Sequence, residues 1–213
     1  NSINKNLIYI INDSTAIQSQ VYFSIKSNPV NDMIRYKSKA YNKYFGGGMS
    51  SIVFQEIREF RSLAYSAWAQ FRRPWYNGNN GHFIGFVGCQ TDKTLEAILV
   101  FKDITMNMPQ KAERIELIKS SLVKGINSQR PSFRSYPSIA RRWKKMGYSD
   151  DPRKDQVSYF KSMKFSDLVD FQKNNIYNKP MVISILTDTT RIDMNELRNY
   201  GEVIFLTKED VFN

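Results

Sequence analysis

Residues 45–65 read FGGGMSSIVFQEIREFRSLAY, and this stretch carries more information than any other part of the chain. Three consecutive glycines precede apolar residues at helical spacing, which predicts a tight turn followed by a core-facing helix. The apolar stripe consists of Met49, Ile52, Val53, Ile57 and Phe60. Arg58 lies off that stripe, and Tyr65 follows it where the pattern changes to that of a strand. The pattern alone favours Tyr65 as a core aromatic, and it leaves open whether the two side chains form a functional site.

The glycine turn has three interpretations. A phosphate-binding loop would use glycine N–H groups ahead of a helix, but GGGMSS lacks the lysine of GxxxxGK[ST] and does not fit GxGxxG. A tight connection would need glycines with positive φ, and Ser50 or Ser51 would cap the next helix. In the third interpretation bare backbone lets an extended peptide approach closely, so Gly46, Gly47 and Gly48 are candidate substrate-binding residues.

Periodicity predicts an α+β fold, with a mixed, mainly antiparallel sheet and helices packed mostly on one face. The expected strands are residues 5–12, 16–26, 63–71, 82–90, 181–188 and 202–207. The expected helices are residues 33–45, the segment from Ser50 or Ser51, and residues 94–108, 111–126, 138–147, 156–163, 166–175 and 194–201. A hairpin turn is expected at residues 74–81. We expect residues 1–213 to form a single module.

Four residues are expected to mark helix ends. Asp32 is the expected N-cap of the first helix, and Gly46 is its expected stop. Ser166 is the expected N-cap of helix 166–175, with Phe165 before it as a hydrophobic staple.

Composition excludes a disordered chain, because 41% of the 213 residues are hydrophobic. No apolar run reaches the length of a membrane span. The first residues, NSINKN, carry neither an initiator methionine nor a signal-peptide pattern, so we expect a fragment of a longer chain. With Cys89 as the single cysteine, no internal disulfide can form.

The formal net charge is +11, and residues 130–164 hold ten Lys or Arg against three Asp. A helix with Arg141, Arg142, Lys144 and Lys145 around Trp143 is typical of a nucleic-acid contact, but no nucleic-acid-binding motif surrounds it. A solvated basic face explains the same residues, so nucleic-acid binding is kept only as a weaker alternative.

Neither a self-contained metal site nor a nucleophilic triad is expected. His82 is the single histidine, and neither HExxH nor HxxEH occurs. His82 and Cys89 are seven residues apart on one expected strand, which places them on opposite faces.

Residues 41–65, YNKYFGGGMSSIVFQEIREFRSLAY, resemble the second-half domain of the pitrilysin/insulinase family of zinc metallopeptidases, the inverzincins. Members typically carry a glycine-rich turn, then a helix of the form SSxLFQEIREKRGLAYS, then a β-hairpin. The chain matches GGGMSS, FQEIRE and LAYS almost without gaps, and its remaining strands and helices follow the same order. It departs at Phe60-Arg61-Ser62, where the family often has Lys-Arg-Gly, so the helix exit is expected to differ slightly.

The resemblance implies that this chain is the zinc-free partner of a homologous domain that carries HxxEH, on the same or a companion chain. In the family that other domain binds zinc, and water on the metal attacks the scissile carbonyl of a peptide enclosed between the domains. Helix 33–45 takes the place of the zinc motif here but reads RYKSKAYNKYF, without ligands. No metal is therefore expected in this chain, and the fragment alone is expected to be inactive.

The family's R-x6-Y pattern falls on Arg58 and Tyr65, which the resemblance assigns to catalysis and substrate binding. A fixed Tyr O–H donor can stabilise the oxyanion of peptide hydrolysis, and arginine can hold substrate carbonyls nearby. The alternative function is a non-catalytic scaffold or binding subunit, as some homologues in respiratory complexes are. The cell envelope, the periplasm and the cytoplasm stay open as locations.

Overall fold

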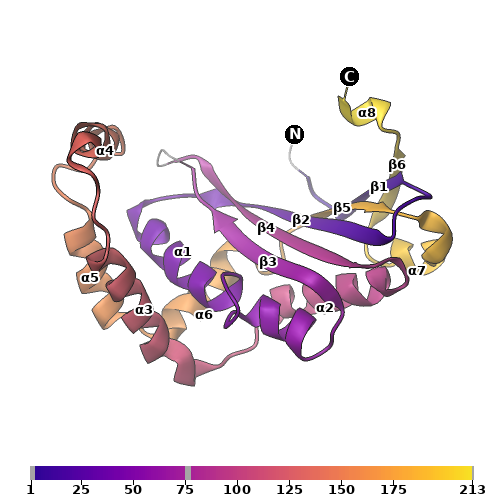
Figure 1. Cartoon of the computed structure of the whole chain (residues 1–213), viewed down its shortest axis with the longest axis horizontal. Helices are drawn as coiled ribbons and strands as arrows, with labels where there is room; N and C mark the ends of the chain where they lie inside the picture. The colour runs from indigo at the N-terminus through magenta and orange to yellow at the C-terminus, as the bar shows by residue number, and fades with distance from the viewer. Residues whose placement is uncertain (1–2, 75–77, 213) are drawn as a thin grey trace.

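The computed structural model describes residues 3–74 and 78–212, in which one twisted sheet is lined by helices (Figure 1). Within these residues the sheet has six strands in the order β3-β4-β2-β5-β1-β6. The strands are β1 (Leu7–Asn12), β2 (Gln18–Pro29), β3 (Ala64–Arg72), β4 (Asn80–Gln90), β5 (Met181–Thr187) and β6 (Glu202–Leu206). β1 runs parallel to β5 and to β6, and the other three pairings are antiparallel. The predicted mixed α+β sheet is confirmed.

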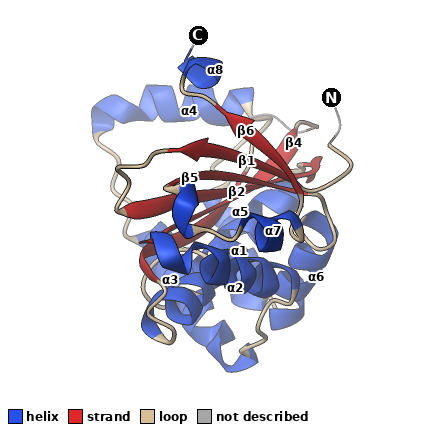
Figure 2. Ribbon diagram, turned by 90° about the vertical axis from the view of Figure 1, so that its right-hand side faces the viewer, coloured by secondary structure: helices blue, strands red, loops and turns tan. Residues whose placement is uncertain are grey.

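Most helices form a layer on one face of this sheet. The helices are α1 (Asp32–Phe45), α2 (Thr94–Met106), α3 (Ile115–Asn127), α4 (Tyr136–Lys145), α5 (Arg153–Ser162), α6 (Phe165–Asn175), α7 (Met194–Arg198) and α8 (Glu209–Phe212), with a π-helix, η1 (Phe54–Glu59). Figures 1 and 2 show α1, α2, α3 and α6 below the strands and α4 apart from that layer. On the opposite side of the strands, here called the open face, the described residues form no such layer.

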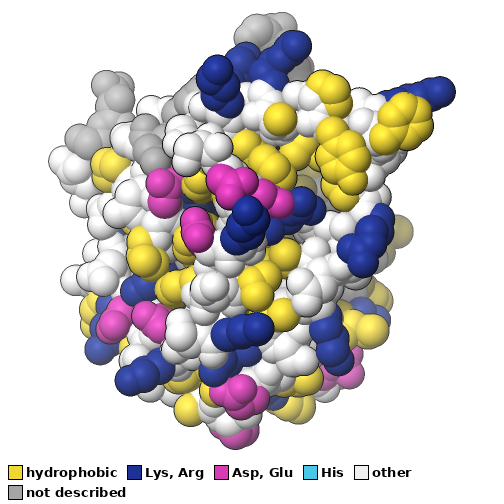
Figure 3. Space-filling model, turned by 90° about the vertical axis from the view of Figure 1, so that its left-hand side faces the viewer, with side chains coloured by type: hydrophobic (Ala, Val, Ile, Leu, Met, Phe, Trp, Pro, Cys, Tyr) yellow, Lys and Arg dark blue, Asp and Glu magenta, His cyan; other side chains and the backbone are white. Residues whose placement is uncertain are grey.

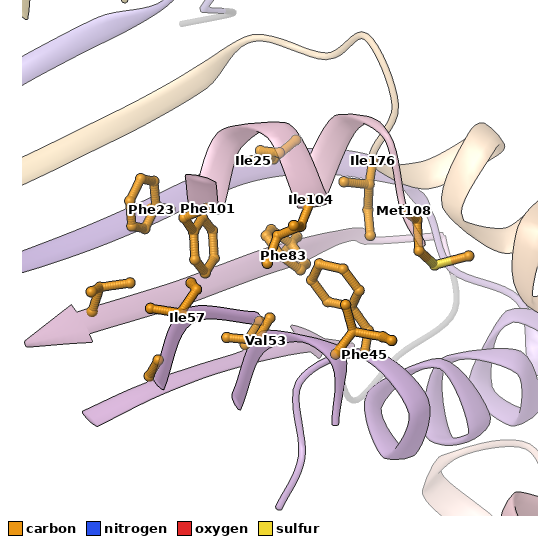
Figure 4. Packing of buried hydrophobic residues seen from close by; sticks show 14 of the residues in the cluster. Phe23, Ile25, Phe45, Val53, Ile57, Phe83, Phe101, Ile104, Met108 and Ile176 are labelled. Carbon is orange, nitrogen blue, oxygen red and sulfur yellow. The ribbon is translucent and has the colours of Figure 1, made fainter. Parts of the chain in front are cut away.

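Aromatic side chains fill the space between the sheet and the helix layer. Phe23 of β2 stacks on Phe101 of α2 with ring centroids 3.9 Å apart, and Phe83 of β4 lies 6.3 Å from Phe101. Figure 4 shows Val53 and Ile57 reaching the same cluster from the segment after α1. The buried side chains form one cluster that extends along the chain from Ile8 to Leu197. The chain therefore has a hydrophobic core of its own.

The apolar stripe predicted on the helix after the glycine turn is partly wrong. Ile52, Val53 and Ile57 are buried as expected, but Met49 is 77% exposed and Phe60 is 64% exposed. The segment forms a π-helix, in which Phe60 N–H donates to Gln55 C=O at 2.9 Å, five residues back. This wider turn changes the phase of the side chains, so residues after Ile57 no longer follow α-helical spacing.

Two predicted helix caps are also wrong, each by one or two residues. Asn31, not Asp32, caps α1, because its Oδ1 accepts from the N–H of Ile34 at 2.9 Å. Helix α6 already begins at Phe165, whose ring meets Tyr44 edge-on with centroids 5.3 Å apart. Ser166 therefore lies inside the first turn, where it cannot act as the N-cap.

The other expected elements lie close to their predicted ranges, and the short helix α8 was not predicted. Gly46 follows the end of α1 as predicted. Residues 75–77 of the expected hairpin turn lie outside the described residues, while the antiparallel pairing of β3 with β4 on either side is present. A membrane span needs an apolar helix of about 20 residues, and no helix in the described ranges meets that requirement.

Candidate functional site

Arg58 sits on η1, the π-helix that follows the glycine turn. Its guanidinium lies over the Phe54 ring, 4.9 Å from the centroid, and its Nε is 4.0 Å from Glu59 Oε1. The side chain is 48% exposed, so the guanidinium keeps access to an incoming group. A ring face beneath a guanidinium stabilises the cation and limits its orientations.

The end of η1 is held by Glu56. Arg61 donates to the Glu56 carboxylate at 2.7 Å and to its backbone C=O at 2.8 Å, and Lys111 donates to the other carboxylate oxygen at 3.2 Å. Burial acts to raise the pKa of Glu56, but the hydrogen bonds from Arg61 and Lys111 outweigh it and hold that pKa below its ordinary value. The ionised carboxylate thus ties the helix exit to the segment before α3.

Tyr65 is the extra residue of a β-bulge in β3. Ala64 is paired with Cys89, and Ser66 is paired with Gly88. Between these two pairs the register moves by two residues along β3 but by one residue along β4. Both Tyr65 and Ser66 consequently lie on the open face, where a regular strand would alternate. Tyr65 is 57% exposed, and its Oη accepts a hydrogen bond from Gln90 Nε2 at 3.2 Å. The tyrosine O–H can still donate to another group.

Arg58 and Tyr65 line the same pocket, which has a volume of about 390 Å³. Its other lining residues are Glu59, Ser62, Leu63, Ala64 and Gln90. The backbone reverses between η1 and β3 through Ser62, which has φ of +51°. The chain thus brings a cation and a phenol O–H to one hollow at the edge strand of the sheet, a combination suited to binding a carbonyl oxygen. Sequence reasoning missed the bulge and Gln90, and no local sequence signal marks either one.

The three glycines do not line this pocket. Gly46 is buried where α1 meets β3: its C=O accepts from Ala69 N–H at 3.2 Å, and a Cβ on Gly46 would lie 1.9 Å from the Ala69 oxygen. Gly48 alone of the three has positive φ, at +87°. Ser51 Oγ accepts from the N–H of Phe54 at 3.4 Å, so Ser51 takes the expected capping role.

The described residues hold no group of three or more His, Cys, Asp or Glu side chains placed to bind a metal ion. His82 is exposed and Cys89 is fully buried, on opposite faces of β4 as predicted. Burial raises the pKa of the Cys89 thiol to about 11, which keeps it protonated and unreactive at neutral pH. The donor set in this part of the chain therefore does not fit zinc.

The basic residues gather at one end of the molecule, around α3, α4 and α5. Arg134, Arg141, Arg142 and Lys145 line a cavity of about 450 Å³ on one side of α4, a helix without a buried side chain. Figure 3 looks onto this end and shows Lys and Arg side chains across its surface. This patch is far along the chain from the pocket that holds Arg58 and Tyr65, and the two share no lining residue.

Solved structures with a similar fold include several proteases. A peptidase M16 inactive domain from Pseudomonas fluorescens has a TM-score of 0.70 at 15% identity over 86% of this chain and 44% of its own length. The periplasmic protease PqqL from Escherichia coli has a TM-score of 0.63 at 14% identity over 87% of this chain and 21% of its own length. A chain of complex III from Candida albicans has a TM-score of 0.59 at 14% identity over 94% of this chain and 50% of its own length.

This chain thus spans half or less of each of those three proteins, and at such identities the likeness shows the fold alone. No curated protein matches the sequence. The profile of the family described as "Peptidase M16 inactive domain" matches residues 2–122, more than half of the chain, including η1 and the β3–β4 hairpin. The predicted family is thereby confirmed: the chain belongs to the inactive-domain branch of the peptidase M16 family, the pitrilysin-type peptidases.

Proposed function

We propose that this chain is the zinc-free half of a pitrilysin-type endopeptidase and that Tyr65 and Arg58 contact the peptide being cut. The observation that carries the proposal is the pocket of about 390 Å³ in which both side chains lie, with Tyr65 turned outward by the bulge. The HxxEH-bearing domain, on the same or a companion chain, would supply the zinc, because no donor set in the described residues fits it.

The chemistry follows from the residue types. As a peptide carbonyl is attacked, negative charge develops on its oxygen, and an O–H donor fixed at that place stabilises the charge. Gln90 holds the Tyr65 oxygen as donor, which leaves the phenol hydrogen for the carbonyl. The Arg58 guanidinium, which lies over the Phe54 ring, can donate hydrogen bonds to a second substrate carbonyl or to a carboxylate. The pocket thus binds and orients, while bond cleavage depends on the opposite domain.

The test is Tyr65→Phe in the full-length protein assembled with its HxxEH domain. Loss of one oxyanion donor is expected to lower kcat by about 10²–10³-fold, with KM nearly unchanged. Because Tyr65 is 57% exposed, the substitution should change the free energy of unfolding by no more than about 0.5 kcal/mol, as is usual for a surface residue. Tyr177→Phe removes a hydroxyl from another half-exposed tyrosine and serves as the matched control. Unchanged turnover in Tyr65→Phe would remove the catalytic assignment.

The second candidate function is a non-catalytic scaffold or binding subunit. The observation in its favour is the similarity to a chain of complex III from Candida albicans over 94% of this sequence. The two functions differ in what the rest of the protein contains. If neither the full-length protein nor a companion chain carries HxxEH, and the purified assembly cuts no peptide, the scaffold function holds and the peptidase function fails.

A further inference from the structure

The open face of the sheet carries an unusual set of side chains. Pairing register joins one residue from each strand into a row that crosses the whole sheet: Trp68, Phe86, Tyr22, Ser184, Tyr9 and Ile204. We call Trp68, Phe86 and Tyr22 of this row the aromatic row. Phe86 lies between the other two rings, with centroids 4.8 Å from Tyr22 and 5.9 Å from Trp68.

These rings are not a covered core. Tyr22 is 46% exposed, and Trp68 and Phe86 are half-buried. The two neighbouring rows cross the sheet in the same way and start on β3 at Gln70 and at Ser66. Among the strand residues of these two rows, the only charged one is Glu202 on β6, at the far edge of the sheet. Strand residues that point to solvent are normally polar. The chain has 51 charged side chains, so the scarcity of charge in these rows does not come from a lack of charged residues. An aromatic patch with so few charges in the rows beside it indicates a binding surface.

The aromatic row is continuous with the pocket of Arg58 and Tyr65. Gln90, which holds the Tyr65 hydroxyl, lies on β4 four residues beyond Phe86 and on the same face. Trp68 lies three residues beyond Tyr65 on β3. At a rise of about 3.3 Å per residue, these separations are about 10–13 Å, the length of three or four residues of extended peptide. Beyond Tyr22 a cavity of about 540 Å³ continues over β5 and β1. Its lining is mostly apolar, with Tyr9 and Leu186 among the residues, and it includes the charged Asp13 and Lys208.

We propose that the aromatic row is a subsite for an aromatic or large aliphatic side chain of the bound peptide, three or four residues from the bond held near Tyr65. This inference rests on the proposed function, because it needs a peptide in the Tyr65 pocket. The occupant is a peptide and not a polyanion, because the strand positions of the aromatic row and of the rows on either side offer no cation. Arg72 and Lys26 lie on this face one row further from Tyr65, beyond Gln70. The row would select peptides by hydrophobic side chain, whereas Tyr65 and Arg58 contact backbone carbonyls that every peptide has.

The experiment uses this 213-residue chain with Trp75→Phe and Trp143→Phe, so that Trp68 is the single tryptophan and can be excited selectively. Two peptides are titrated that differ at one position, four residues from the scissile bond, where one has Phe and the other Ser. We expect the Phe peptide to shift and enhance the Trp68 emission and to bind roughly tenfold more tightly than the Ser peptide. Tyr22→Ser should abolish that preference, while Tyr177→Ser, which removes an exposed aromatic ring outside the sheet, should preserve it.

Equal binding of the two peptides, or a preference that survives Tyr22→Ser with the fold intact by circular dichroism, would overturn the subsite. So would a Trp68 emission that shifts with protein concentration alone, because a second copy of the chain would then cover the face. The result is separable from the catalytic assignment, because it does not depend on turnover. Tyr65→Phe can fail to slow the enzyme while the Trp68 titration still shows the Phe preference, and the reverse is equally measurable.

Discussion

Ser62 is the residue on which the helix exit depends, and its backbone is strained. Its φ of +51° lies in the left-handed region, which costs a residue with a Cβ about 1–2 kcal/mol. Its N–H donates to the Arg58 C=O at 3.1 Å, so the strained residue closes the turn that separates Arg58 from Tyr65. The sequences that this stretch resembles often place glycine here, and serine is the departure that was expected to alter the exit.

Ser62→Gly should therefore stabilise the protein by about 0.5–1 kcal/mol, since glycine removes the left-handed penalty but loses more entropy on folding. Urea unfolding followed by circular dichroism measures the change, with an unchanged m value. Ser62→Ala keeps the Cβ and is the control, expected within about 0.5 kcal/mol of the native chain because the serine side chain is exposed. A Ser62→Gly variant less stable than the alanine variant would show that φ at this residue carries no strain.

At the scale of elements, the glycine turn fixes how closely α1 approaches β3. Asn42 near the end of α1 donates to and accepts from the backbone of Phe71, at 3.0 and 2.7 Å. Together with the bond from Ala69 N–H to Gly46 C=O, these contacts satisfy three backbone groups on the outer edge of β3. The edge strand that carries Tyr65 is thus anchored by a glycine whose missing side chain permits the contact.

Gly46 and Gly48 should respond differently to substitution by alanine. Gly46→Ala would place a Cβ 1.9 Å from the backbone oxygen of Ala69, so α1 must move away from β3, at a cost of about 2–3 kcal/mol. Gly48→Ala meets nothing within 4 Å and should cost only about 1 kcal/mol through its positive φ. Thermal or urea unfolding of the two variants gives the comparison. A Gly46→Ala variant as stable as Gly48→Ala would contradict the close approach.

Much of this element structure could be predicted from sequence, and the failures have a common cause. Alternation located the strands, and the FQEIRE and LAYS motifs located Arg58 and Tyr65, because both signals are local. The π-helix, which turned Phe60 outward, and the bulge at Tyr65 arise from backbone hydrogen bonds that no side-chain pattern encodes. Strand order, with β1 between β5 and β6, likewise depends on packing between segments far apart in the chain. The aromatic row became visible only once that order was known.

At the scale of the whole molecule, charged side chains are distributed unevenly over the surface. The aromatic row and the rows on either side carry one charged strand residue, Glu202, while Arg and Lys side chains line two cavities at the end formed by α1, α4 and α5. There Lys39 of α1 and Arg73 line one cavity with Gln156 of α5, and Lys39 Nζ donates to Gln156 Oε1. Burial, with the nearby Arg73 as a second cause, lowers the pKa of Lys39 from 10.5 to about 8. A lysine whose charged form is disfavoured in the folded chain destabilises that chain at neutral pH.

The pH dependence of this effect has a definite sign. Below pH 8 both the folded and unfolded chains carry the Lys39 proton, and the folded chain bears the full cost of the buried cation. Between about pH 8 and 10.5 the folded chain releases the proton while the unfolded chain keeps it, so the free energy of unfolding rises with pH. Lys39→Met lacks this group, so its stability advantage over the native chain should shrink across that interval.

Urea unfolding of both proteins at pH 7, 8, 9 and 10 measures the difference. Lys43 is an exposed lysine of the same helix, so Lys43→Met controls for the loss of one positive charge. A native-minus-variant difference that stays flat from pH 7 to 10 would show that Lys39 keeps its charge at the ordinary cost of a surface lysine.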